Sequence, residues 1–444
     1  MSPKSLLIAV YQERRSMAPV AFAAGFCRRW MQKTGIAQKG LPMDIVKACV
    51  SCHHPLTAPT LDLGDLPLCN RFTDRNAVTP THKLSVSDCP SCGLVQAVEV
   101  APVDAIVPRL PWIRYNEPEG HLDKVAQTLM LRSDRNTPKT ALGVGPFDEP
   151  LLARLQNLGC EVERLNLIGD AAPGVGGVGY PYLETMQARL RPEFIGQATS
   201  SLADIVVCRY LIEHSHEPVA SLAALTQLLE PNGVLLIEVP DSEKFLRALD
   251  YCFLWEEHIS YFVERTAKAL AAQAGLRVER FHRFEGQLED ALVLILRRGE
   301  VEPLGTASPE DREVFKRYRT SFASRREAYR SRVASLAAKG KVALIGMGHQ
   351  SIMFLSALGL HPYISLFVDD SPQKQGLRVP GTTTAIIPSA DIVGRSDISA
   401  CLLAISPRAE ITVRAKLKPL SKKGTEILPI YAGIEGKKRL LEAL

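Results

Sequence analysis

From about residue 138 onward, short apolar runs alternate with longer amphipathic segments. The predicted strands are the runs 140–144, 162–168, 204–208 and 234–239, and the predicted helices are 151–158, 219–229 and 266–274. Asp204–Cys208 is almost wholly apolar, which is typical of a strand buried on both faces. Such alternation predicts an α/β fold with a parallel sheet covered by helices. Residues 276–284 and 291–297 are predicted to close this sheet as an antiparallel pair.

A second strand–turn–helix pattern begins at Val342 and predicts a separate Rossmann-like domain at the C-terminus. Between the two patterns, residues 308–338 predict one helix, with Ser308 as its N-cap and Pro309 in its first turn. This helix is rich in arginine, so it could bind phosphate. We favour the alternative of a solvated connector between domains.

Residues 43–105 show a different pattern, with short strand-like runs at 61–64 and 94–98 between Pro and Gly breaks. The segment contains two cysteine pairs, Cys49/Cys52 and Cys89/Cys92, separated by 36 residues. Two residues between thiolates allow both sulfurs of a turn to face one ion, and two such turns complete a tetrahedral zinc site. A site with four cysteines is closed, so we expect a structural zinc ion.

His53, His54 and Cys69 lie between the cysteine pairs and could each replace a ligand. Buried unrelated thiols, or disulfides, are the alternative interpretation. Ten cysteines in a chain of 444 residues fit a reducing compartment better than a disulfide scaffold, and we predict the cytoplasm.

Charge is concentrated at the N-terminus. Residues 1–42 hold seven basic side chains and one acidic one, so their net charge is +6. Because the whole chain has a net charge of +5, the remaining residues carry −1. The nearly neutral remainder argues against nucleic-acid binding, and no run is long and apolar enough to predict a membrane span. The extension resembles a transit peptide, but we favour a start codon assigned too early, because Met43 directly precedes the zinc module.

These observations predict five segments. They are a basic extension that is either untranslated or disordered (1–42), a zinc-binding module (43–110), an α/β domain (111–300), a helical connector (301–338) and a Rossmann-like C-terminal domain (339–444).

Three stretches in this order resemble the three-domain sugar C-methyltransferase family, which joins a zinc-binding domain, a class I S-adenosylmethionine-dependent methyltransferase domain and a Rossmann-like C-terminal domain. The stretches are 61–72 with 92–96, 257–262 with 229–240 before it, and 368–376 with 380–381 after it. The resemblance covers about residues 47–433. It implies methyl transfer to a nucleotide-linked keto-sugar, a small-molecule substrate.

The resemblance also implies roles for residues near the Glu-His motif. His258 would be the general base that removes a proton next to the ketone, with Glu257 as its neighbour or as a ligand of a substrate hydroxyl. Tyr261 would orient the substrate. The alternative is that Glu257 and His258 cap the following helix while Tyr261 packs in the core.

For the cofactor, the resemblance points to the turn after the first strand and to the end of the second. We predict that Gly143, Gly145, Asp148 and Asn166 bind S-adenosylmethionine. In the C-terminal domain, Gly346-x-Gly348 follows a strand, although the third glycine of a dinucleotide fingerprint is absent. We predict that Gly346, Gly348, Asp369 and Lys374 line a substrate pocket; closing a strand–helix turn is the alternative.

The chain departs from the family pattern in its cofactor turn. Gly143 stands in place of an acidic residue, Glu149 stands in place of a glycine, and Pro146 and Pro150 stiffen the turn. Asn166 stands where an acid would bind the ribose.

The active-site motif departs too, since Trp255-Glu256-Glu257-His258 replaces Tyr-His-Glu-His, and Glu285-Gly286-Gln287 replaces Gly-Gly-Ser. Two hypotheses therefore stay open, a C-methyltransferase or a catalytically inactive relative that binds a nucleotide-sugar or a partner protein. Zinc-dependent nucleic-acid binding ranks last.

Overall fold

The computed structural model describes residues 44–45, 48–56, 58–74, 78–107, 110, 117–131, 138–165, 190–198, 201–301, 305–431 and 440–441. The predicted N-terminal extension and Asn166 lie outside these residues. Among the helices of the described ranges, none combines the length and the apolar composition that crossing a membrane requires.

The N-terminal module is built on an antiparallel sheet of strand order β10-β4-β3-β2. The elements of the module are β1 (Asp44–Ile45), β2 (Leu61–Pro67), β3 (Thr81–Asp88), β4 (Val95–Ala97), β5 (Glu99–Val100), α3 (Val103–Ile106) and the late strand β10 (Ser260–Tyr261). Both predicted strand-like runs are confirmed. Strand β10 was not predicted; its Ser260 pairs with Gln96 and its Tyr261 pairs with Val95. A segment far along the chain thus completes the sheet of this module.

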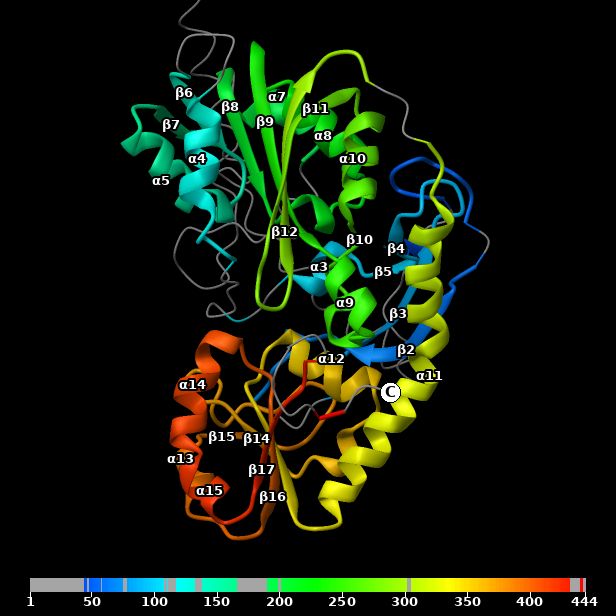
Figure 1. Cartoon of the computed structure of the whole chain (residues 1–444), viewed down its shortest axis with the longest axis vertical. Coiled ribbons are helices and arrows are strands. Elements are labelled where there is room, and N and C mark those ends of the chain that lie inside the picture. The colour runs from blue at the N-terminus through cyan, green and yellow to red at the C-terminus, as the bar shows by residue number, and fades with distance from the viewer. Residues whose placement is uncertain are drawn as a thin grey trace, which may run out of the picture. The chain divides into compact units, whose positions relative to one another are not determined.

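The central domain is a six-stranded sheet of order β11-β12-β9-β8-β6-β7, in which β7, β6, β8 and β9 are parallel (Figure 1). Its strands are β6 (Thr140–Gly143), β7 (Glu161–Arg164), β8 (Ala203–Arg209), β9 (Leu229–Asp241), β11 (Leu276–Phe284) and β12 (Asp290–Arg298). Its α-helices are α4 (Leu122–Met130), α5 (Glu149–Asn157), α7 (Pro192–Ala198), α8 (Pro218–Thr226), α9 (Glu243–Ala248) and α10 (Glu264–Gln273). The predicted antiparallel closure by β11 and β12 is confirmed.

Strand alternation places the apolar side chains of this sheet in two cores. Val234 and Leu236 of β9 pack with α4 and α5 on one face. Leu235 and Ile237 pack with α7, α8 and α10 on the other. Helices therefore cover both faces, as a run of nearly continuous apolar strand residues predicts.

The end of α8 and the start of β9 differ from the prediction. The helix ends at Thr226, and the strand already begins at Leu229. The register of β9 on β8 jumps from Leu229 to Val234, so the Pro-Asn-Gly sequence marks a bulge instead of a loop between elements. At Gly233, an added Cβ would lie 2.9 Å from the carbonyl oxygen of Ala203, which explains the glycine.

The predicted connector is the helix α11 (Pro309–Ala337), and its predicted cap is confirmed because Ser308 Oγ accepts a hydrogen bond from Asp311 N at 3.1 Å. The prediction of a solvated helix is wrong for one face. Its buried residues are Phe315, Tyr318, Phe322, Arg325, Tyr329, Val333 and Leu336. This spacing of three and four residues is an apolar stripe that the many arginines obscured.

The C-terminal domain has a fully parallel sheet of order β15-β14-β13-β16-β17, with helices on both faces. Its elements are β13 (Lys341–Ile345), α12 (His349–Ala357), β14 (Leu366–Val368), β15 (Ile386–Ile387), α13 (Ala390–Val393), β16 (Ile398–Leu403), α14 (Pro407–Lys416), α15 (Lys418–Lys422) and β17 (Glu426–Pro429). The predicted Rossmann-like arrangement is confirmed, because the central α/β domain is followed by a second domain with a parallel sheet and helices on both faces.

Candidate functional site

The four predicted zinc ligands converge in the N-terminal module. One sulfur from each of Cys49, Cys52, Cys89 and Cys92 lies within 4.8 Å of all the others. The Sγ atoms of Cys49 and Cys92 are 3.5 Å apart, as are those of Cys52 and Cys89. Sulfur atoms bound to zinc at about 2.3 Å in a tetrahedron would be separated by nearly this distance. The donor set fits a closed structural zinc site.

Each knuckle is a tight turn closed by a backbone hydrogen bond. His53 N donates to Cys49 O at 2.9 Å, and Gly93 N donates to Cys89 O at 2.8 Å. Both donors have positive φ, +59° at His53 and +73° at Gly93. An added Cβ at Gly93 would also lie 2.9 Å from the Ala307 side chain, so glycine is required there.

The three alternative zinc ligands are not part of the group of converging sulfur atoms. His53 and His54 are exposed, and Cys69 is fully buried next to Glu256. Cys69 N donates to Glu256 Oε1 at 2.5 Å. Burial and the neighbouring carboxylate raise the pKa of the Cys69 thiol well above its ordinary value.

The Glu-His motif lies where the three parts of the chain meet. Asn70 of the N-terminal module donates to Glu257 Oε1 at 2.6 Å. From the C-terminal domain, His349 at the start of α12 stacks on Trp255, with ring centroids 4.1 Å apart. The indole of Trp255 therefore serves as a stacking surface for an imidazole.

His258 faces a second imidazole, that of His214, with ring centroids 4.7 Å apart. Burial lowers the pKa of His258 well below its ordinary value, and the neighbouring His214 and His349 lower it further. The imidazole is neutral at neutral pH as a result, which is the form that can accept a proton or bind a metal ion.

Two residues beside His258 were not predicted as site residues from the sequence. Glu213 and His214 form a 3-10 turn (Ile212–His214) directly after β8. Both are buried, and His214 Nδ1 lies 2.9 Å from the backbone oxygen of Glu257. A signal existed, because an acidic residue and a histidine stand four and five residues after a buried parallel strand, and functional groups gather at the carboxyl edge of such sheets.

Tyr261 is buried, and its hydroxyl group is occupied by the backbone of Trp255. The hydroxyl accepts from Trp255 N at 3.1 Å and donates to Trp255 O at 3.2 Å. These contacts favour a role in bracing the motif over the predicted role in orienting a substrate.

The glycine turn after β6 is held by Asp148. Asp148 Oδ2 accepts from Val144 N at 2.7 Å and Gly145 N at 2.6 Å, while Oδ1 accepts from Arg209 N at 2.8 Å. Burial raises the pKa of Asp148 to about 7 although these donors lower it. A Cβ at Gly143 would collide with Leu152 of α5, so this glycine serves helix packing.

A buried ion pair adjoins this turn. Arg209, at the end of β8, donates to Glu238 Oε2 at 2.6 Å and to the backbone oxygen of Phe147. His121 Nε2 lies 2.9 Å from Glu238 Oε1. Burial would raise the pKa of Glu238, but its hydrogen bond to His121 and the charge of Arg209 hold that pKa below its ordinary value. In the sequence, the sign of this pair is that Arg209 and Glu238 each directly follow a run of four apolar residues.

The predicted substrate residues of the C-terminal domain form a closed network. Asp369 Oδ2 accepts from Met347 N at 2.8 Å and from Lys374 Nζ at 2.9 Å. At Gly346, where φ is +90°, an added Cβ would lie 2.7 Å from the oxygen of Ala404. These contacts favour the alternative of a strand–helix turn, although a Cβ at Gly348 would meet nothing within 4 Å.

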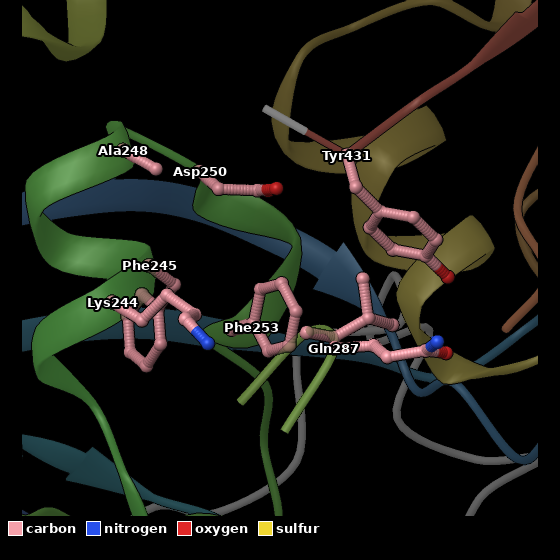
Figure 2. Close-up of a pocket in the computed structure, with 8 residues that line it drawn as sticks. Lys244, Phe245, Ala248, Asp250, Phe253, Gln287 and Tyr431 are labelled. Carbon is pink, nitrogen blue, oxygen red and sulfur yellow. The ribbon is translucent and has the colours of Figure 1, made fainter. Parts of the chain in front are cut away.

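A small pocket lies apart from these residues, beside α9 (Figure 2). Phe253, Gln287 and Tyr431 line it together with Lys244 and Asp250. It has room for about one water molecule, far less than a ligand pocket provides. Lys244 Nζ also donates a hydrogen bond to Asp290 Oδ1 at 2.5 Å.

Three family models match the chain in sequence. They are a "Putative zinc binding domain" at residues 49–106, a "Methyltransferase domain" at 120–280 and a "C-methyltransferase C-terminal domain" at 305–430. The curated C-methyltransferase NovU of Streptomyces niveus is 26% identical over 420 residues, which cover 87% of this chain and 97% of that protein.

Solved structures resemble part of the chain. A 1,6-didemethyltoxoflavin-N1-methyltransferase from Burkholderia thailandensis is 17% identical and aligns 41% of this chain with 80% of its own at a TM-score of 0.30. A magnesium protoporphyrin IX methyltransferase from Synechocystis is 14% identical and aligns 41% of this chain with 83% of its own at a TM-score of 0.29.

Proposed function

The chain belongs to the three-domain C-methyltransferase family, and from this premise we propose that it methylates a carbon next to the carbonyl group of a nucleotide-linked keto-sugar. The observation that carries the proposal is a half-buried, neutral His258 at the junction of the three parts of the chain. A neutral imidazole is a suitable base for a proton next to a carbonyl group.

The cofactor of this family, S-adenosylmethionine, supplies an electrophilic methyl group when bound. The turn after β6 fits such a ligand at Gly145, because an added Cβ there would meet Asp148 Oδ2 only at 3.8 Å and Leu211 at 3.9 Å. The backbone of Gly145 is thus open to close approach. Asp148 would shape the turn from within, and the predicted role of Asn166 at the ribose stays a prediction.

The chain's own residues would act on the substrate. His258 would accept the proton from the carbon next to the carbonyl, and the electrons of the broken C–H bond would pass to the carbonyl oxygen as an enolate. His214 would support the base by excluding water and by contact with its ring. A Cβ added at Gly145 would lie 3.9 Å from Leu211, which is three residues before His214, so base and turn share one edge of the sheet.

Glu257 would bind a substrate hydroxyl or hold the motif in place. Its carboxylate accepts from Asn70, and its backbone oxygen faces His214 Nδ1. Through these contacts, the N-terminal module would position the residues around the base. Its structural zinc ion would contribute to catalysis only by keeping that module folded.

A second candidate function is a catalytically inactive relative that binds a nucleotide-sugar. One observation favours it: the backbone donors of Val144 and Gly145 are both bonded to Asp148. A cofactor carboxylate would have to compete for donors that are already engaged.

Calorimetric titration with S-adenosylmethionine separates the two candidates. We expect saturable binding for the enzyme, and the inactive relative would give a flat titration. Transfer of a labelled methyl group to a panel of nucleotide-linked keto-sugars then tests the substrate class.

The role of the base has its own test, which needs no methyl donor. Nuclear magnetic resonance in heavy water would follow proton exchange at the carbon next to the carbonyl group. We expect His258→Asn to lower this exchange and turnover by about 10²–10⁴-fold with cofactor binding unchanged. His54→Asn, at an exposed position, is the matched control. Unchanged exchange in His258→Asn would remove the proposed role.

A further inference from the structure

A second group of metal-ligating side chains lies apart from the four cysteines. One ligand atom from each of Glu213, His214 and His258 lies within 4.8 Å of the others. The group joins the 3-10 turn after β8 to the turn before β10, so two distant segments of the chain supply it. Two imidazoles and one carboxylate are a donor set that divalent transition metals bind well.

Glu213 carries an unsatisfied oxygen at this position. The residue is 1% exposed, and its Oε2 atom has no hydrogen-bond partner among the described residues. A buried carboxylate oxygen without a partner costs free energy, and burial raises the pKa of Glu213 well above its ordinary value. A bound cation would satisfy this oxygen and stabilise its charge.

His214 is oriented as metal-binding histidines are. Its Nδ1 lies 2.9 Å from the backbone oxygen of Glu257, and a carbonyl oxygen can only accept a hydrogen bond. The hydrogen of the neutral ring is therefore on Nδ1, and the lone pair is on Nε2. A hydrogen bond from the ring nitrogen that does not bind the metal holds histidine ligands in place. Burial lowers the pKa of His214 to about 4, so the ring is neutral at neutral pH.

We propose that Glu213, His214 and His258 bind one divalent transition-metal ion of the zinc class, in a site separate from the four-cysteine site. Three protein ligands would leave one tetrahedral position open, in contrast to the closed cysteine site. Ligand atoms around such an ion are about 3.3 Å apart when the bonds are about 2.0–2.1 Å. Because the present separations are at most 4.8 Å, the side chains need to close in by no more than about 1.5 Å.

The ion would compete with the proposed base. While His258 donates its lone pair to a metal ion, it cannot accept a proton from the substrate. This consequence rests on the proposed function, whereas metal binding itself does not. An excess of such an ion would inhibit proton exchange of the substrate, and a chelator too weak to strip the cysteine site would restore it.

Cobalt(II) titration of the full-length, zinc-loaded protein tests the site directly. We expect one cobalt ion per chain to bind with visible d–d absorption and without the thiolate-to-cobalt charge-transfer band that cysteine ligands give. One zinc ion per chain should stay bound throughout, as measured by elemental analysis.

Variants locate the ion. We expect His214→Ala and Glu213→Gln to weaken cobalt binding by at least about 100-fold, since loss of outer-shell partners alone costs 10–100-fold. His349→Ala is the matched control, because it removes a nearby imidazole that is outside the group. Thermal unfolding and retained zinc show whether each variant is folded.

Two results would refute the proposed site. One is that no cobalt binds to the zinc-loaded protein. The other is that His214→Ala binds cobalt as tightly as the original protein. Neither result bears on methyl transfer, which is measured on chelator-treated protein. An active protein without a second ion refutes only the metal site. A second ion in a protein that does not bind S-adenosylmethionine refutes only the proposed function.

Discussion

The two ligand groups of this protein differ in how the chain assembles them. The four cysteines come from two local turns of one module, each closed by its own backbone hydrogen bond. Glu213, His214 and His258 come from two turns of the central domain, and contacts from the other two parts of the chain surround them. Local spacing is therefore sufficient to specify the first group, whereas the second depends on tertiary packing.

The two groups also differ in chemistry. The cysteine site is closed, with four thiolates for four positions. The second group has two neutral imidazoles and an unsatisfied carboxylate oxygen, so it can accept a proton or a cation. The two groups are therefore separate in the structure, and Cys69 and Asn70 of the N-terminal module contact Glu256 and Glu257, which directly precede His258.

Loss of the zinc site should have the largest effect. We expect Cys89→Ser to release zinc and unfold the N-terminal module, because structural zinc contributes on the order of 10 kcal/mol to the folding of small domains. Differential scanning calorimetry with elemental analysis measures both. Cys401→Ala, a buried thiol in β16, is the control and should cost about 1–2 kcal/mol with zinc retained. Equal melting of both variants would contradict the assignment.

The pH dependence of stability tests the contact between Trp255 and His349. Burial and, to a smaller extent, the neighbouring His214 lower the pKa of His349 to about 4. The unfolded chain takes up this proton below pH 6.5, so the contribution to stability is complete above pH 6.5 and is lost as the pH falls toward 4.

We expect a slope of about 1.4 kcal/mol per pH unit from this group between pH 6.5 and 4, or about 3 kcal/mol in total. His349→Phe keeps a ring against Trp255 and should remove this part of the slope. Denaturant unfolding at a series of pH values measures it. Parallel curves for both proteins would show that His349 does not titrate in this way.

The next largest effect on stability is expected from loss of the hydrogen bond between Asn70 of the N-terminal module and Glu257 of the Glu-His motif. Asn70→Ala removes the donor to Glu257 and leaves a buried carboxylate less satisfied, at a cost of about 2–3 kcal/mol in the free energy of unfolding. Chemical denaturation measures this cost. Asn157→Ala, at the exposed end of α5, is the control and should change stability by less than about 0.5 kcal/mol. A similar cost for both variants would mean that the contact does not hold the motif.

The smallest effect is expected at the start of α11, beside the second zinc knuckle. Ser308→Ala removes the N-cap and should cost about 1 kcal/mol. Ala307 N already donates to Ser91 O at 3.1 Å, so the knuckle also holds this end. A cost near zero, measured by denaturant unfolding, would show that the zinc-bound turn alone fixes the helix start. Thr320→Ala, at an exposed position of α11, is the control.

The strands and helices were predictable where a single period sets the pattern. The runs at 140–144 and 204–208 are strands in the structure, as predicted, and so is the closing pair of 276–284 with 291–297. The stripe on α11 was missed because arginines outnumber its aromatic residues along the sequence. Its regular spacing of three and four residues was nevertheless present in the chain.

The candidate site divides in the same way. The cysteine ligands and the motif at Glu257 and His258 were visible as short patterns, and their catalytic roles stay predictions. The position of Asp148 inside its turn was not predictable, because a carboxylate written next to a glycine turn can face either a ligand or the backbone. Only the packing of α5 and β8 decides which.

By itself, the sequence determined the alternation of strands and helices, the cysteine site and the resemblance to a family, because all three are written in near-neighbour spacing. The tertiary structure alone decided that β10 joins the sheet of the N-terminal module and that His258 meets Glu213 and His214. It also decided that the side chains of Asp369 and Lys374 bind each other. Contacts between distant segments form only when whole elements pack, and no local period in the chain records which partners they choose.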